Sequence, residues 1–234
     1  MRGRKRFAVL FIIMVISCTV AAGFSIWFLY RAALEGQRQR LTETAQSQAR
    51  LIEAVYRFDK EFMGEYPDGH KAATLSQIKD AHRTYKGFGE TGEFTLARRD
   101  GGKIIFLLSH RHYDLDNPEP VDINSTRALP MRLALSGKSG TVIGPDYRGK
   151  RVLAAHEPVS GLDLGIVAKL DLDEIRAPFI RAAIVATLAL AVIILVSAYL
   201  FLLIGRPVIR ELENKNRKLA DEIDLQYRKV NVTR

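Results

Sequence analysis

The sequence predicts an α+β domain held between two transmembrane helices, and three observations lead to this fold class. Two runs, residues 7–30 and 182–205, contain no charged side chain. Each run has 24 residues, enough for a helix of about 36 Å against a hydrocarbon core of about 30 Å. The polar segment between them changes from helical to strand periodicity along its length, and it is long enough for one folded domain.

The formal net charge of +9 is concentrated beside the two apolar runs. Residues 1–6 hold four basic side chains and no acidic one, and residues 206–234 hold eight basic and five acidic ones. The middle is nearly balanced, with 23 basic and 21 acidic side chains. This is the positive-inside pattern of membrane topology, so it argues against a nucleic-acid partner. It predicts a two-span membrane protein with both termini cytoplasmic and the domain outside the cytoplasm.

The predicted organisation has five segments along the chain. They are a cytoplasmic N-terminus, a transmembrane helix, an extracytoplasmic domain, a second transmembrane helix and a cytoplasmic helix: residues 1–6, 7–30, 31–178, 179–205 and 206–234. A cleaved signal peptide is the alternative for the first run, because its segment VISC, which ends at Cys18, resembles a loose lipoprotein box. The cores of signal peptides are about 7–15 residues long and then turn polar. This run stays apolar to Tyr30, so a transmembrane helix is preferred.

Helix and strand signals follow one another in a definite order inside the domain. Apolar residues at helical spacing predict a long helix over 31–62, ended by glycine and proline at 64–69. Two hairpins with a short helix between them, a last strand and an exit helix from Asp173 come next: strands 93–99, 103–109, 140–144, 151–158 and 164–171, and short helix 125–136. We expect the strand 103–109 to be central because it is apolar on both faces, and 110–124 to be a loop. The order predicts an α+β domain with a five-stranded antiparallel sheet.

Five short segments carry a resemblance to a known family: 92–96 (GEFTL), 135–140 (LSGKSG), 146–149 (DYRG), 152–155 (VLAA) and 165–171 (GIVAKLD). In this order, and between two membrane helices, they resemble the extracytoplasmic Cache sensors. These are the PAS-like domains of bacterial histidine kinases, chemoreceptors and diguanylate cyclases. The resemblance covers about residues 31–178. It implies a PAS-like Cache fold and a ligand-sensing role in signal transduction, such as that of a two-component system.

Catalytic and metal-binding motifs were sought in the same domain. The pair His110 and His112 has a spacing that suits a metal only on a strand, and here it falls in the predicted loop. Ser139 lies in a GKSG segment that lacks the first glycine and the spacing of a phosphate-binding loop. The sequence holds no nucleophile elbow and no HExxH motif. We therefore expect no catalysis, no metal and no cofactor in this chain.

Polar side chains around a PAS-like pocket are the candidate ligand contacts. Such a pocket lies between the sheet and the loops and short helix that cover it, which gives five candidates: Arg111, Arg127, Arg132, Tyr147 and His156. Arginine binds a carboxylate through a bidentate fork, so an organic anion is the expected ligand. His156 shares a strand face with the small residues Val152 and Ala154, which leave room for a ligand. Each candidate also has a structural explanation, namely a surface arginine, a packing tyrosine or a hydrogen-bonded histidine.

The segment after the second apolar run predicts a coiled coil. Seam residues recur at spacings of three and four: Ile209, Leu212, Asn216, Leu219, Ile223, Gln226 and Val230. Asparagine at an a position is typical of parallel dimers, so Leu212, Asn216, Leu219 and Ile223 are expected to form a homodimer seam. A solvated helix with no partner is the alternative.

Together these features predict a homodimeric sensory receptor of the inner membrane. Its periplasmic domain would bind a small molecule, and displacement of helices would carry the signal to a cytoplasmic output domain or protein. One alternative is the N-terminal sensor portion of a membrane histidine kinase or diguanylate cyclase whose catalytic domain follows Arg234. A structural anchor that binds no ligand is a third hypothesis.

Overall fold

The computed structural model describes residues 2–62, 69–109, 111, 119–200, 203, 215, 218 and 219. Its helices and strands follow the order α1, α2, β1, β2, β3, α3, β4, β5, β6, α4. The chain divides into two units. One is the folded domain, Trp27–Ile180, and the other consists of Met1–Ile26 and Arg181–Arg234.

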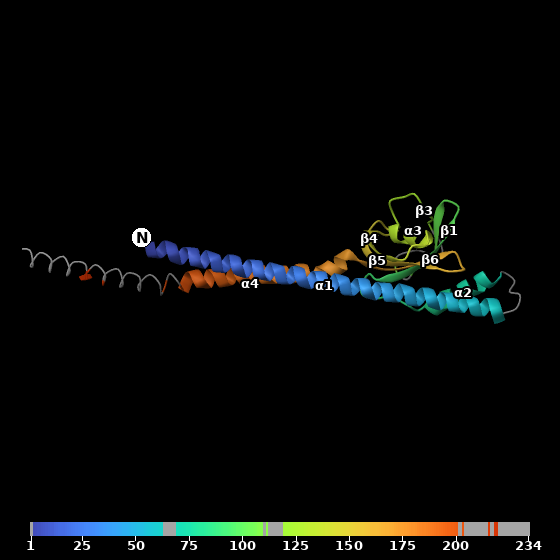
Figure 1. The fold of residues 1–234 in the computed structure, drawn as a ribbon, viewed down its shortest axis with the longest axis horizontal. Helices are drawn as coiled ribbons and strands as arrows, with labels where there is room; N and C mark the ends of the chain where they lie inside the picture. The colour runs from blue at the N-terminus through green and yellow to red at the C-terminus, as the bar shows by residue number, and fades with distance from the viewer. Residues whose placement is uncertain are drawn as a thin grey trace, which may run out of the picture. The chain divides into compact units, whose positions relative to one another are not determined.

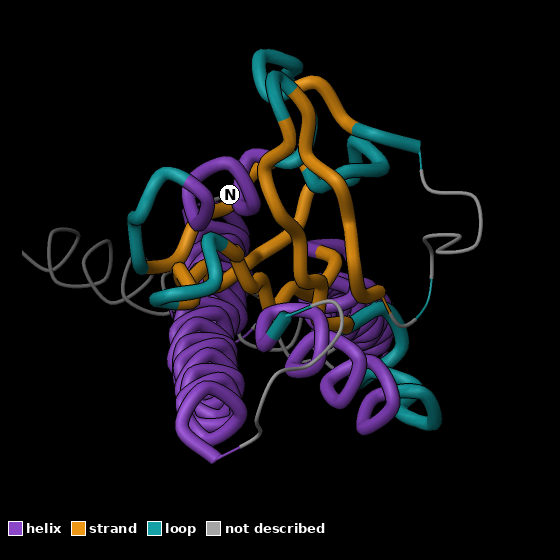
Figure 2. The backbone as a smooth tube through the Cα atoms, turned by 90° about the vertical axis from the view of Figure 1, so that its right-hand side faces the viewer, coloured by secondary structure: helices purple, strands orange, loops and turns teal. Residues whose placement is uncertain are grey.

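An antiparallel sheet of six strands forms the centre of the folded domain, in the order β3-β2-β1-β6-β5-β4. The strands are Glu93–Asp100 (β1), Lys103–Ser109 (β2), Val121–Asp122 (β3), Gly140–Pro145 (β4), Arg151–Val159 (β5) and Leu164–Asp171 (β6). The sheet curls along its length, as the tube in Figure 2 shows. Together with the helices it confirms the predicted α+β class.

Helices cover both faces of this sheet (Figure 1). On one face lie the domain part of α1 (Arg2–Phe62) and α2 (His70–His82), and on the other lies the short helix α3 (Leu129–Leu135). The pleat separates the two sides because successive side chains of a strand point to opposite faces. On β5, Leu153 packs with Leu41 of α1, whereas its neighbour Val152 packs in the cluster of Met131 under α3. The last helix, α4, spans Leu172–Leu200.

The sheet differs from the sequence-based expectation in strand number and in strand order. The additional strand is β3. It comes from the predicted loop 110–124 and pairs Val121 with Ile104 of β2. Two residues are too few to show a strand period, so β3 has no recognisable pattern in the sequence. The short helix α3 begins at Leu129, later than the predicted start at 125.

The expectation that 103–109 is a central strand was wrong, because β1 and β6 occupy the centre of the sheet. A bulge explains why β2 is apolar on both faces. Leu96 of β1 pairs with Leu108, but Ala97 pairs with Phe106, so Leu107 is an extra residue in β2. Phe106 and Leu108 therefore pack into clusters on opposite sides of the sheet.

Two helical segments, Val9–Phe62 of α1 and Leu172–Leu200, are long and apolar enough to cross a membrane. Their apolar side chains outside the folded domain are largely exposed, for example Ile12, Phe24, Leu188 and Leu195. Such exposure suits a lipid environment and is costly in water. The single cysteine, Cys18, is also exposed on α1.

Candidate functional site

A small cavity lies between α3 and the sheet, and its wall has an apolar half and a polar half. The apolar half consists of Phe106, Ala128, Pro130, Met131 and Val167, and the polar half of Thr95, Asp146, Tyr147 and Lys169. Its volume is about 10 Å³, which is room for about one water molecule. Packed side chains thus fill most of the space at which a PAS-like pocket is expected.

Close packing of α3 on the sheet keeps this space small. Gly165 of β6 has no side chain, and a Cβ there would lie 2.8 Å from Cβ of Ala134 and 3.1 Å from Sδ of Met131. A Cβ on Gly144 of β4 would lie 2.6 Å from Cδ2 of Leu129. These two glycines allow α3 to rest directly on the strands below it.

A buried lysine is the central residue of the polar half. The side chain of Lys169 is only 2% exposed, and its Nζ lies 2.8 Å from Oε1 of Glu93 and 2.5 Å from Oδ2 of Asp146. The same nitrogen is 4.5 Å from the centroid of the Tyr147 ring. An ammonium group loses several kcal/mol of solvation on burial unless opposite charges and hydrogen bonds offset the loss. Two carboxylates and an aromatic face perform that role here; we call Lys169, Glu93, Asp146 and Tyr147 the buried charge cluster.

The pleat of β6 explains how Lys169 reaches this place. Ile166 and Leu170 of β6 belong to the clusters on the α1 face, and Val167 belongs to the cluster under α3. Lys169 is two residues beyond Val167 and therefore points to the α3 side as well. The lysine interrupts an otherwise apolar central strand, which makes it a costly residue to place there.

Glu93 connects the buried charge cluster to the end of β2. Its Oε1 accepts hydrogen bonds from Lys169 and from the Tyr147 hydroxyl at 2.7 Å, and its Oε2 accepts one from Ser109 Oγ at 2.8 Å. Burial by itself raises the pKa of Glu93, but the Lys169 charge and these hydrogen bonds outweigh it. The pKa of Glu93 is therefore lower than usual, and the carboxyl group is ionised at neutral pH.

Asp146 anchors the turn between β4 and β5 to the buried charge cluster. Its Oδ1 accepts the backbone N–H groups of Arg148 at 2.8 Å and Lys150 at 3.0 Å, and its Oδ2 accepts Nε of Arg148 at 2.7 Å. Arg148 also donates to Asp171 at 2.5 Å. Burial tends to lower the pKa of the Arg148 guanidinium, but its hydrogen bond and charge interaction with Asp146, followed by those with Asp171, outweigh this effect and raise it. Ion pairs and hydrogen bonds of Asp146, Arg148 and Asp171 thus hold the turn in place.

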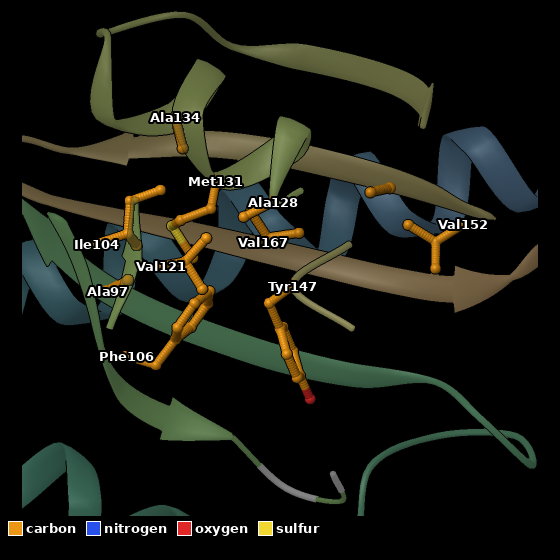
Figure 3. Close-up of a cluster of buried hydrophobic side chains, with 11 residues drawn as sticks. Ala97, Ile104, Phe106, Val121, Ala128, Met131, Ala134, Tyr147, Val152 and Val167 are labelled. Carbon is orange, nitrogen blue, oxygen red and sulfur yellow. The ribbon is translucent and has the colours of Figure 1, made fainter. Parts of the chain in front are cut away.

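Tyr147 joins the apolar and polar halves of the cavity. Figure 3 shows its ring beside Phe106, with the hydroxyl group pointing out of the apolar cluster, and the two ring centroids are 5.0 Å apart. The hydroxyl donates to Glu93 and lies 3.4 Å from Ser109 Oγ. Burial, with the Glu93 charge, raises the pKa of Tyr147 above its usual value. Tyr147 is therefore a neutral hydrogen-bond donor at this site.

Of the five predicted ligand contacts, only Tyr147 lines the cavity. His156 does share the α3 face with Val152 and Ala154, but its Nδ1 is 2.8 Å from the carbonyl oxygen of Lys138. That bond ties β5 to the loop after α3 and gives His156 a structural partner.

The three predicted arginines have different surroundings in the fold. The Arg111 guanidinium donates to backbone carbonyls of Gly89, Glu90 and Gly92. Arg127 is exposed. Arg132 is half-buried on α3, and its buried Nε has no hydrogen-bond partner among the described residues. The structure does not gather them into one anion site.

Sequence reasoning missed all three charged residues of the buried charge cluster. Lys169, Glu93 and Asp146 all lie in segments that were used to recognise the fold, and none was considered as a ligand contact. The signal for Lys169 was present, since a lysine at a core-facing position of the strand 164–171 needs a buried partner. The partners themselves were not readable, because they come from β1 and from the β4–β5 turn.

No protein-family model and no curated protein matches this sequence. The cavity itself places the charged groups of Lys169 and Asp146 in contact beside an apolar wall.

A larger groove lies on the α1 face of the domain. Its volume is about 390 Å³, and it lies between Arg40 and Thr44 of α1 and Glu174 of α4.

No group of three or more metal-binding side chains occurs in the part of the chain that the structure describes. His110 and His112, the pair considered above, lie outside that part, as do Leu212, Asn216 and Ile223 of the predicted seam. Leu219 is described, is helical and is 55% exposed.

Proposed function

We propose that this chain is a sensory receptor of the bacterial inner membrane, and that its α+β domain is a PAS-like Cache sensor. The domain lies in the periplasm, both termini are cytoplasmic, and a small molecule binds between α3 and the sheet. The observation that carries this proposal is the burial of Lys169 against Glu93 and Asp146 at the edge of the cavity. Perturbed ionisable groups cluster at functional sites, and in a purely structural core apolar residues would pack without this desolvation cost.

The closed cavity corresponds to the receptor without ligand in this proposal. A void of about 10 Å³ admits no organic molecule, so binding requires side chains of the wall to move. Lys169 and Asp146 are partners in the closed state and become the ligand contacts in the open one. The ligand supplies the free energy for opening through its higher affinity for the open arrangement.

The charges of the wall favour a ligand that carries both signs. A carboxylate on the ligand pairs with Lys169 and an ammonium group pairs with Asp146, while an apolar side chain contacts Phe106 and Met131. An organic anion, the ligand expected from the arginines, pairs with Lys169 but leaves Asp146 without its main partner. An amino acid with an apolar side chain is therefore the first candidate, and organic anions are the second.

A screen with matched ligands tests this proposal. Leucine, 4-methylpentanoate and isopentylamine carry the same isobutyl side chain, but the acid lacks the amino group of leucine and the amine lacks its carboxylate. With the full chain in lipid nanodiscs, we expect leucine, or another apolar amino acid, to raise the melting temperature more than its acid or amine counterpart. Lys169→Met should abolish the shift, whereas the exposed Lys103→Met should preserve it. The absence of a shift with amino acids, organic acids or amines at millimolar concentration would overturn the sensing function. A shift that persists in Lys169→Met would show that the ligand does not bind at this cavity.

Signalling in the proposed receptor uses two copies of the chain. Each domain is connected by α4 to the second apolar segment and then to the predicted seam of Leu212, Asn216, Leu219 and Ile223. A change in helix position reaches a cytoplasmic output domain or protein through this route. The same sensor also serves the alternative in which a histidine kinase or diguanylate cyclase domain follows Arg234.

A further inference from the structure

The loop 87–92, between α2 and β1, is held by side chains from two different parts of the domain. The loop closes on itself, since Phe88 N donates to the carbonyl oxygen of Gly92 at 3.0 Å. Gly87 and Gly89 have φ values of +82° and +60°, a conformation that glycine adopts without strain. A Cβ on Gly89 would lie 2.5 Å from Oε1 of Glu174. The glycine thus allows a carboxylate of α4 to reach the loop backbone.

Glu174, in the first turn of α4, holds the loop from one side. Its Oε1 accepts the amide of Glu90 at 2.9 Å, and its Oε2 accepts the amide and the hydroxyl of Thr91 at 2.8 and 2.6 Å. The hydroxyl of Thr91 in turn accepts the amide of Asp171 at 3.0 Å. These charge-assisted bonds tie the loop to the junction of β6 and α4.

Arg111 holds the loop from the other side. Its guanidinium donates to the carbonyl oxygens of Gly92, Glu90 and Gly89 at 3.1, 2.7 and 2.7 Å. The backbone amide of Arg111 lies 3.3 Å from Oε2 of Glu93 and donates to it. Because Glu93 also pairs with Lys169, a chain of contacts runs from Lys169 through Glu93 and Arg111 to the loop.

We infer that Arg111 and Glu174 form a two-sided clamp on residues 89–92, and that this clamp couples the buried charge cluster to the first turn of α4. When Lys169 loses its pairing with Glu93, the carboxylate shifts, the Arg111 amide loses its acceptor and the loop loosens its hold on Glu174. The use of this coupling in signalling rests on the proposed function. The coupling itself is a property of the folded domain and needs no ligand.

Hydrogen–deuterium exchange of the full chain in lipid nanodiscs tests the coupling. The perturbation is Lys169→Met, with Lys103→Met as the surface control. We expect exchange at residues 87–92, where the Glu90 and Thr91 amides bind Glu174, to rise about tenfold more than exchange at Ile123. Ile123 donates to Gly102 at the far end of the sheet, so it reports general loss of stability. An equal rise at both places, or none at 87–92, would overturn the inference.

A double-mutant cycle keeps the test decisive if Lys169→Met does not fold. Arg111→Gln changes an exposed residue and Glu174→Gln a half-buried one, and Arg127→Gln, also exposed, is the matched control. We expect Arg111→Gln to speed exchange of the Thr91 amide about tenfold in the natural chain and less than about twofold in the Glu174→Gln chain. Equal effects in both chains would mean two independent contacts. Neither measurement involves a ligand, so a failed ligand screen leaves this inference intact, and a failed cycle leaves the pocket intact.

Discussion

The ammonium nitrogen of Lys169 lies 2.5 Å from Oδ2 of Asp146, and each side chain is only 2% exposed. The two residues come from β6 and from the turn between β4 and β5. Asp146 also accepts two backbone amides of its own turn, so the ion pair fixes the turn against the central strand. Removal of either partner leaves the other charge buried without its main compensation.

The first prediction concerns the stability that depends on Lys169. Lys169→Met keeps most of the side-chain volume, but it leaves Glu93 as a buried carboxylate without its cation and leaves Asp146 paired with Arg148 alone. We expect a loss of about 3–5 kcal/mol in the free energy of unfolding, measured by chemical denaturation of the purified chain. Lys103→Met, on an exposed position of β2, should change the stability by less than about 0.5 kcal/mol. Equal effects of the two variants would mean that the buried charge cluster contributes nothing to the free energy of unfolding.

The second prediction concerns the dependence of stability on pH. The pKa of Glu93 in the folded chain is below its ordinary value of 4.5, so the unfolded chain binds a proton more readily. The stability due to Glu93 is therefore present above pH 4.5 and is lost as the pH falls through the folded pKa. We expect the melting temperature of the natural chain to fall more between pH 6 and pH 3 than that of Glu93→Gln. Parallel curves would contradict this assignment.

The third prediction concerns the contact between α3 and β6. Gly165→Ala places a Cβ 2.8 Å from Cβ of Ala134, so the helix must move away from the sheet. Overpacking of this kind costs about 1–3 kcal/mol, and it should lower the melting temperature. Gly102→Ala is the control, because a Cβ there meets no atom within 4 Å. A Gly165→Ala protein as stable as the control would show that α3 does not rest on β6 in solution.

The fourth prediction concerns membrane topology. Alkaline phosphatase is active only outside the cytoplasm, so a fusion near Gly101 should be active and a fusion after Arg234 inactive. The basic residues at 1–6 and Arg206 motivate this orientation. The reverse pattern of activities would contradict the two-span arrangement and the periplasmic location of the domain.

The fifth prediction concerns the seam after the second apolar run. Single cysteines are introduced at Leu212, Lys215, Asn216 and Leu219 in a Cys18→Ser background, and the chains are oxidised in membranes. In a parallel dimer, positions 212, 216 and 219 face the partner and should crosslink readily, while position 215 should lag. Uniformly weak crosslinking would indicate a monomeric tail and leave the receptor without this route for its signal.

The sequence by itself determined the elements that depend on local pattern. An α+β domain with apolar helices at both ends was predictable from two uncharged runs, the glycine turn at 100–102 and the alternating strands. These features are local, because helix and strand periods appear in the spacing of apolar residues along the sequence. The same reasoning missed β3 at Val121–Asp122, and it misplaced β2, because a bulge at Leu107 produced apolar residues on both faces.

The tertiary structure alone decided which polar residues meet. The pleat already placed Lys169 on one face of its strand, but whether α3 covers that face depends on contacts between distant segments. Lys169, Asp146 and Glu93 come from three separate parts of the chain, and packing places the Lys169 ammonium 2.8 Å from Glu93 and 2.5 Å from Asp146. Arg111 was likewise a candidate ligand contact on the sequence alone. In the fold, its guanidinium instead donates to the carbonyl oxygens of Gly89, Glu90 and Gly92. Desolvation explains this difference: a charge inside a folded domain must find its partner there, and only the three-dimensional arrangement determines which partner is near.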